Sequence, residues 1–314
     1  MTKKIPNNWT GRDDAMVEHA IRRGASRREL LKMMMASGVG MAAGGSLLMS
    51  AGRAVAASPV YGGHLKAAGW SSSTADTLDP AKASLSTDYV RCCAFYNRLT
   101  FLNEAGEVEM ELADSISTDD AVTWEVKLKK DVAFHDGHTL NADDVIYSLN
   151  RHLDEAVGSK VNSIAKQMTE ISKLDDTTVK IVLATANADL PTILALHHFM
   201  IIAEGTTDFA KANGTGPFLC EVFEPGVKSI AAKNPNYFKS EGPYLDSFEF
   251  FAITDNNARV NALLSGDIQV AAAVNPRSLR MLEGHDTVRT SVSTSGNYTD
   301  LNIRLDLSPG DKAG

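Results

Sequence analysis

The chain has 314 residues, 44% of them apolar and 22% charged, which is ordinary for a globular protein and enough for two domains. Its formal net charge of −8 argues against nucleic acid as the main partner, because phosphate binding requires clustered Lys and Arg. Basic residues gather only in residues 1–56, which contain nine Lys and Arg against four Asp and Glu, so the rest of the chain is acidic.

Residues 1–56 have the layout of an export signal. A basic part ends at Lys32, and an uncharged stretch covers residues 33–52. Ala54 and Ala56 then fit an A-x-A site for a signal peptidase. We therefore expect a cleaved leader and a mature protein that works outside the cytoplasm, in the periplasm.

The basic part of this leader contains the stretch "SRRELLK". Arg27 and Arg28 in it resemble the paired arginines of the twin-arginine export signal, which a receptor reads directly. A retained membrane anchor is the alternative, because 20 uncharged residues can just span a bilayer core of about 30 Å. The glycines and serines of this stretch make it a weak membrane segment, so the pattern favours cleavage, after Ala56 or Ala57.

The first elements of the exported part follow from local patterns. Residues 65–69 predict a short strand, which leads through a polar loop to a turn at Asp79-Pro80. A helix is expected from about Thr87 to Leu99. Residues 123–128 alternate between apolar and polar side chains, which is typical of a half-buried strand.

The stretch "FHDGHTLNADDVIYSL" then predicts a capped helix. Asn141 is a good N-cap, and Asp143 and Asp144 place negative charge at the positive end of the helix dipole. Apolar residues from Val145 to Leu153 recur every four positions, so this helix should face a core.

The remaining elements alternate in the same way. We expect a strand in "DDTTVKIVLAT", a helix at 190–199, two strands joined at 224–226, a strand in "FEFFAIT", a helix ended by Gly266 and a strand in "DIQVAAAV". Mixed strands and helices without a tandem repeat indicate an α/β architecture.

Three residues ahead of the capped helix raise the question of chemistry. His135, Asp136 and His138 lie within four positions and suggest either a metal or acid–base site or a structural turn. Asp136 and Gly137 are turn formers, and no third ligand has a recognisable metal-site spacing, which favours scaffold. The chain also lacks a GxSxG or HExxH motif, so a periplasmic hydrolase built on these histidines remains the weaker alternative.

Two further motifs are ambiguous. Gly214 and Gly216 fill the first two positions of GxGxxG, but the third glycine is missing and a strand follows, so a phosphate-binding loop is not expected. The pair His197-His198 lies in an apolar stretch and is interpreted as packed or at the surface rather than as a ligand pair.

Cysteine is scarce. Cys92, Cys93 and Cys220 form no CxxC pair, so a zinc ribbon or a thioredoxin-like motif is excluded. Free thiols and a single bond from Cys92 or Cys93 to Cys220 both stay open.

Several stretches together resemble the extracytoplasmic solute-binding proteins of ATP-binding-cassette (ABC) importers, in the dipeptide, oligopeptide and nickel group. They are "GGHLKAAG" with "TLDPAKAS", "LADSISTDDAVTWEVKLKKDVAFHDGHTLNADDVIYSL", "GTGPF" with "EPG" and "NPNYF", and "ARVNALLSGDIQ". Each stretch is modest alone, but their order and spacing over residues 62–305 make the match strong.

The resemblance implies a fold of the periplasmic-binding-protein type, α/β and bilobal, similar to type II and cluster C. Residues 57–100 and 207–290 would form the first lobe, and 101–206 its inserted subdomain. Residues 291–314 would begin a second lobe that is mostly missing from the chain. We expect residues 57–314 by themselves to bind solute weakly, because the second lobe normally covers the ligand.

The resemblance also implies a function without covalent chemistry, cofactor or metal. The protein would capture a peptide or similar small solute in the periplasm for a membrane permease and its ATPase subunits. Expected ligand-binding residues are Trp70, Ser71, Ser72, Thr215, Gly216 and Tyr298. Besides the hydrolase, a chaperone-like module that holds unfolded peptide is an alternative.

Overall fold

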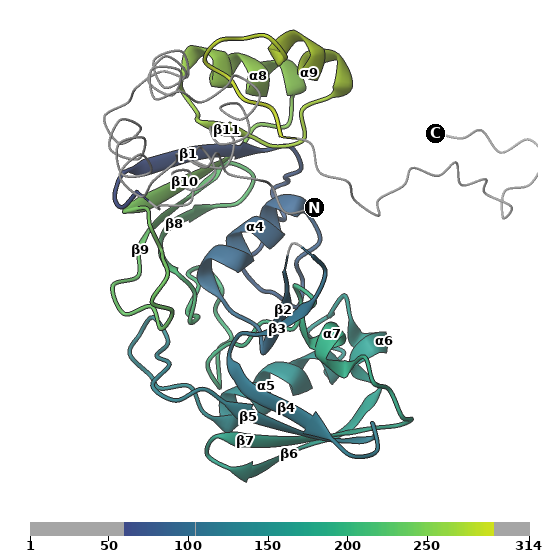
Figure 1. The fold of residues 1–314 in the computed structure, drawn as a ribbon. Helices are drawn as coiled ribbons and strands as arrows, with labels where there is room; N and C mark the ends of the chain where they lie inside the picture. The colour runs from purple at the N-terminus through teal and green to yellow at the C-terminus, as the bar shows by residue number, and fades with distance from the viewer. Residues whose placement is uncertain (1–59, 104, 292–314) are drawn as a thin grey trace, which may run out of the picture.

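The computed structural model describes residues 60–103 and 105–291. Two larger sheets form separate layers of the molecule, with helix α4 (Ser86–Phe95) between them (Figure 1). A short hairpin of β2 (Thr100–Leu102) and β3 (Val108–Met110) follows α4. No helix in the described part of the chain is long and apolar enough to cross a bilayer.

The first sheet combines segments from distant parts of the sequence. Its strands, in spatial order, are β11 (Val270–Ala271), β1 (His64–Gly69), β10 (Ser247–Ala252), β9 (Lys228–Lys233) and β8 (Phe218–Glu224). β1 pairs in parallel with both neighbours, whereas β8, β9 and β10 form an antiparallel meander. Helices α8 (Asn256–Ser265) and α9 (Pro276–Leu282) lie beside β11 (Figure 1).

The second sheet is antiparallel and local in sequence. Its spatial order is β4 (Ala113–Thr118), β5 (Thr123–Leu128), β7 (Thr178–Leu183) and β6 (Met168–Asp175). Helix α5 (Ala142–Asn150) packs on it and continues into the 3-10 turn η1 (Arg151–Leu153); the short helices α6 (Asn162–Ala165) and α7 (Leu190–Leu194) lie nearby.

Each sheet has its own apolar core. Trp124, Val126 and Leu128 of β5 are buried beneath α5, as the alternating pattern predicts, together with Val145 and Leu149 of that helix. A second core under the five-stranded sheet is built around α4 by side chains that include Phe95, Tyr96 and Leu78. Burial of these faces is what fixes the two layers around α4.

Several predicted elements are confirmed with their capping residues. The Asn141 side chain accepts the Asp143 N–H at 2.7 Å at the start of α5, and Gly266 ends α8 in the left-handed conformation. Others are shorter than predicted. Helix α4 ends at Phe95 rather than near Leu99, α7 ends at Leu194 rather than 199, and β11 spans only two residues.

Candidate functional site

A turn at Trp70–Ser73 leaves the carboxyl end of β1 and passes over the start of α4. The Trp70 side chain is 50% exposed. Gly69, just before it, allows the close approach of strand and helix, because a Cβ there would lie 2.7 Å from Phe250 and 2.8 Å from Thr87. Sequence and packing thus place an exposed aromatic residue at the mouth of a parallel β–α connection, where α/β proteins commonly bind ligands.

The serine hydroxyls of this turn are engaged within the protein. Ser71 Oγ accepts the Ser86 N–H at 3.0 Å and lies 2.6 Å from Ser86 Oγ, so Ser71 caps helix α4 from a distant part of the sequence. The Ser72 hydroxyl donates to Asp76 Oδ2 at 2.5 Å. The Thr87 hydroxyl donates to the Ser71 carbonyl. These contacts hold the turn in one conformation.

The backbone of the same turn is left open. Within residues 60–103 and 105–291, no hydrogen bond involves the N–H groups of Trp70, Ser71 or Ser72, or the carbonyl groups of Trp70 and Ser72. A backbone with unpaired donors and acceptors can pair with an extended ligand as a further strand would. The turn therefore offers main-chain groups and one indole ring.

Asp76 and Arg91 form a buried ion pair behind this turn, and no sequence pattern pointed to either residue. Arg91 Nη1 lies 2.7 Å from Asp76 Oδ2, and both side chains are completely buried. Burial alone would raise the pKa of Asp76, but hydrogen bonds from Ser72, Arg91 and Ser73 outweigh it and hold that pKa below its usual value. A covariation between the two positions is the signal that would have found the pair.

Thr215 and Gly216 lie elsewhere. Thr215 is fully buried, and its hydroxyl donates to Asn97 Oδ1 at 3.0 Å. The Gly216 N–H donates to the carbonyl of Phe95, at the end of α4 opposite to Ser86. Because a ten-residue helix is about 15 Å long, the structure does not bring these two residues together with the Trp70–Ser73 turn.

The remaining residues that the sequence predicts for ligand binding or export are Tyr298, Arg27, Arg28, Ala54 and Ala56. All five lie outside the described residues.

His135 and Asp136 of the histidine motif form hydrogen bonds to the loop that contains Thr215. His135 N–H donates to the Gly214 carbonyl at 2.8 Å, and its Nε2 lies 3.1 Å from the Gly216 carbonyl. Asp136 Oδ2 accepts from Asn213 Nδ2 at 2.8 Å. Burial lowers the pKa of His135, so its ring is neutral at neutral pH.

The second histidine of the motif has a local partner. His138 Nε2 lies 3.1 Å from Asp144 Oδ2 at the start of α5. Across the described ranges, no three His, Cys, Asp or Glu side chains are grouped to hold a metal ion. The contacts of His135, Asp136 and His138 join the motif to residues 213–216 and to helix α5.

His197 and His198 pack around one tyrosine. Their rings lie 5.2 and 5.5 Å from that of Tyr89, and His198 Nε2 donates to the Ala83 carbonyl at 3.0 Å. This agrees with their interpretation as a packed pair.

The three cysteines are free thiols in the structure. Cys92 is buried, Cys220 is half-buried and Cys93 is exposed.

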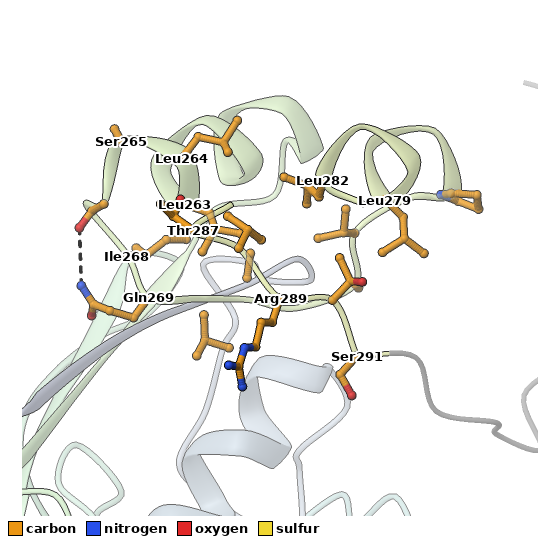
Figure 2. A pocket seen from close by; sticks show the side chains of 18 residues that line it. Leu263, Leu264, Ser265, Ile268, Gln269, Leu279, Leu282, Thr287, Arg289 and Ser291 are labelled. Atoms are coloured by element: carbon orange, nitrogen blue, oxygen red, sulfur yellow. Dashed lines mark hydrogen bonds between the residues drawn. The ribbon is translucent and has the colours of Figure 1, made fainter. Parts of the chain in front are cut away.

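A groove of about 1070 Å³ lies between α8, α9 and residues 287–291. Leu263, Leu279 and Leu282 face its interior, whereas Arg289 extends from the segment that closes it (Figure 2). β11 also lines the groove and pairs with β1 just before Trp70. The helical walls supply apolar contact, and Gln269, Thr287 and Arg289 add polar groups to the lining of the groove.

Comparison with known proteins gives consistent matches. Residues 107–312 match the family model "Bacterial extracellular solute-binding proteins, family 5 Middle". The glutathione-binding protein GsiB of Escherichia coli K12 is 28% identical over 236 residues, which cover 72% of this chain and 46% of GsiB. The chain thus spans about half the length of the curated relatives it matches.

Two solved structures share the fold. AgaA of A. tumefaciens R10, in complex with agropinic acid, has a TM-score of 0.66 and 27% identity, covering 71% of this chain and 46% of AgaA. The oligopeptide-binding protein AppA of Bacillus subtilis, in complex with a nonapeptide, has a TM-score of 0.61 and 26% identity, covering 67% and 44%. These matches confirm the predicted α/β fold of the periplasmic-binding-protein type. The chain belongs to the bacterial extracellular solute-binding proteins of family 5.

Proposed function

We propose that the protein is the periplasmic solute-binding component of an ABC importer and captures a peptide or a solute with peptide-like amide groups. It binds without covalent chemistry and passes the solute to a membrane permease that ATPase subunits drive. Binding proteins of this kind enclose the ligand by domain closure. The hydrolase and the chaperone-like alternatives have no observation in their favour.

One observation supports a peptide-like ligand. The Trp70–Ser73 turn presents unpaired N–H and carbonyl groups next to a half-exposed indole, while its hydroxyls are engaged inside the protein. Such a surface binds a ligand backbone by strand-like hydrogen bonds and tolerates different side chains. The relatives bind glutathione and a nonapeptide, which carry such amides, and agropinic acid.

The proposal includes a division of the chain into lobes. Residues 57–100 and 207–290 form the first lobe, 101–206 its inserted subdomain, and 291–314 the start of a second lobe. In support, the five-stranded sheet takes β1 from the first of these segments and its other four strands from 207–290, whereas the four-stranded sheet lies within 101–206. Tyr298 would contact the solute from the second lobe. Thr215 and Gly216 would affect solute binding indirectly, by holding their loop against Asn97 and the end of α4.

We further propose that residues 1–56 are a leader for the twin-arginine route, read at Arg27 and Arg28 and cleaved at Ala54-Val55-Ala56. The proposal rests on the sequence pattern.

Calorimetry tests the proposed function on residues 57–314, at protein and ligand concentrations high enough to detect the weak binding expected when the ligand is covered from one side only. Glutathione, trialanine, agropinic acid and Ni²⁺ would be titrated separately. We expect heat of binding with glutathione or trialanine and none with Ni²⁺. Stoichiometric Ni²⁺ binding, or turnover of the peptides, would contradict the proposal.

Two variants locate the site. Trp70→Ala removes the indole and should weaken peptide binding about tenfold, which corresponds to the loss of one aromatic contact. Leu174→Ala is the matched control, because Leu174 is 54% exposed but lies on β6 in the other sheet. Equal effects of the two changes would place the ligand away from the turn.

A further inference from the structure

The Asp76 carboxylate joins three segments that meet behind the Trp70–Ser73 turn. Its Oδ1 accepts the Ser73 N–H at 2.8 Å. Its Oδ2 accepts the Ser72 hydroxyl at 2.5 Å, the Gly226 N–H at 3.3 Å and Arg91 Nη1 at 2.7 Å. One side chain thus connects the turn to the β8–β9 connection and to helix α4.

Gly226 fits closely against this turn. A Cβ at Gly226 would lie 3.2 Å from the Ser73 carbonyl oxygen, and its φ of +78° suits glycine. The β8–β9 connection therefore supports the turn by direct backbone packing as well as through Asp76.

Among the described residues, Arg91 is paired with the carboxylate of Asp76 alone. Its Cζ lies 5.3 Å from the ring centroid of Phe223 and 5.6 Å from that of Phe250, so the guanidinium is enclosed by aromatic side chains. Its Nε and Nη2 have no hydrogen-bond partner among the described residues. Asp76 is the one carboxylate to which it is paired in that part of the chain.

A buried pair of this kind is a poor way to gain stability. Desolvation of two charges offsets most of their attraction, and apolar residues of similar volume often stabilise a fold equally well. The charged carboxylate instead orients the Ser72 hydroxyl and the Ser73 N–H, which both donate to it.

We propose that Asp76 and Arg91 are positioning residues that set the conformation of the Trp70–Ser73 turn and thereby the direction of its free backbone groups. This inference rests on the proposed function for its effect on solute binding. Neither side chain touches the solute. Arg91 acts through Asp76, and Asp76 acts through Ser72 and Ser73.

The main test uses the double variant Asp76→Asn, Arg91→Met on the chain from residue 57. It removes both charges together, so no buried charge remains unpaired and the protein should fold. Hydrogen exchange followed by NMR reports on the N–H groups of Ser73 and Gly226, which donate hydrogen bonds to Asp76. We expect Ser73 and Gly226 to exchange about tenfold faster than in the unchanged protein, while amides of β5 and β7 keep their rates.

A matched control removes a second charge pair of the same loop. Arg151 donates to both oxygens of Asp79 at 3.0 and 2.9 Å, and this pair contacts neither Ser72, Ser73 nor Gly226. The variant Asp79→Asn, Arg151→Met should therefore leave the exchange of the Ser73 and Gly226 amides unchanged. If both double variants speed exchange equally, or if the Asp76 and Arg91 variant leaves it unchanged, the proposal is wrong.

Calorimetry with glutathione and trialanine separates positioning from the proposed function. We expect the Asp76 and Arg91 variant to bind the probe about tenfold more weakly, while its melting temperature stays near that of the control variant. Unaltered affinity despite faster exchange would show that the turn geometry does not matter for binding. Absence of binding by the unchanged protein would count against the proposed function, whereas the exchange data would still decide whether the pair positions the turn.

Discussion

His135 Nε2 lies 3.1 Å from the carbonyl oxygen of Gly216, and this contact joins two motifs that are 81 residues apart in the sequence. Because a carbonyl oxygen only accepts, Nε2 must carry the proton. The Gly214 N–H points at Nδ1 from 3.4 Å. Both ring nitrogens therefore face the backbone of one loop, and this arrangement explains a histidine here without a metal or a reaction.

The first prediction concerns His135→Ala. Loss of the ring removes one of the two hydrogen bonds to the Gly216 carbonyl, which keeps Asn234 Nδ2 at 3.0 Å, so the free energy of unfolding should fall by about 0.5–1.5 kcal/mol. Urea titration measures this change. His285→Ala is the control, because His285 is exposed and should have no effect. Stoichiometric zinc or nickel in the purified protein that His135→Ala abolishes would contradict the structural role.

Gly216→Ala gives the second prediction. The added Cβ would lie 2.4 Å from the Phe95 carbonyl carbon and 2.7 Å from the Ala94 oxygen, both in the backbone of α4. Because backbone cannot move aside cheaply, we expect a loss of about 3 kcal/mol in a thermal or urea melt. Gly137→Ala has no atom within 4 Å and only a positive φ to strain, so it should cost about 1 kcal/mol. A smaller loss at Gly216 than at Gly137 would mean that the loop is not packed as described.

The third prediction is a loss of stability in acid caused by His152. Its ring is 2% exposed, stacks edge-on to Phe199 at 4.8 Å and lies 2.7 Å from Ser159 Oγ. Burial, with Arg151 and His198 nearby, lowers the pKa of His152 from 6.5 to about 4. The unfolded chain thus binds a proton at a higher pH than the folded chain does.

The sign follows from this difference. Stability is unaffected above pH 6.5, falls as the pH drops towards 4 and then levels off, with a total loss of about 3 kcal/mol. His152→Gln should remove this part of the slope in urea melts at pH 4 to 7, whereas His64→Gln, at an exposed site, should not. A slope that is equal in all three proteins would show that His152 is not the responsible group.

The fourth prediction tests the export route. Replacing Arg27 and Arg28 with Lys keeps the charge but removes the planar guanidinium groups, so uncleaved precursor should accumulate in the cytoplasm. Cell fractionation and immunoblotting measure it. Lys3→Arg and Lys4→Arg serve as the matched control within residues 1–56. Normal processing of the double-Lys variant would rule out the twin-arginine route.

Local patterns in the sequence predicted much of the fold correctly. The alternation in residues 123–128 identified β5 and its buried face, and Asn141 and Gly266 marked helix ends. Such signals succeed because capping, turn formation and amphipathic burial depend on residues a few positions apart. The candidate site was only partly accessible in this way. Trp70 was predicted to contact the ligand and the structure finds it half-exposed, but the engagement of the hydroxyls of Ser71 and Ser72 was not foreseen.

The sequence by itself determined the α/β class and the family, because these follow from neighbouring residues and from the order of motifs. Only the tertiary structure decided where α4 stops, since the carbonyls of Asn97, Arg98 and Leu99 accept from residues 201, 112 and 111 instead of continuing the helix. Only it brought Asp76 to Arg91 and Gly216 to Phe95. Those contacts join residues far apart along the chain, and their free energy depends on burial that no local pattern records.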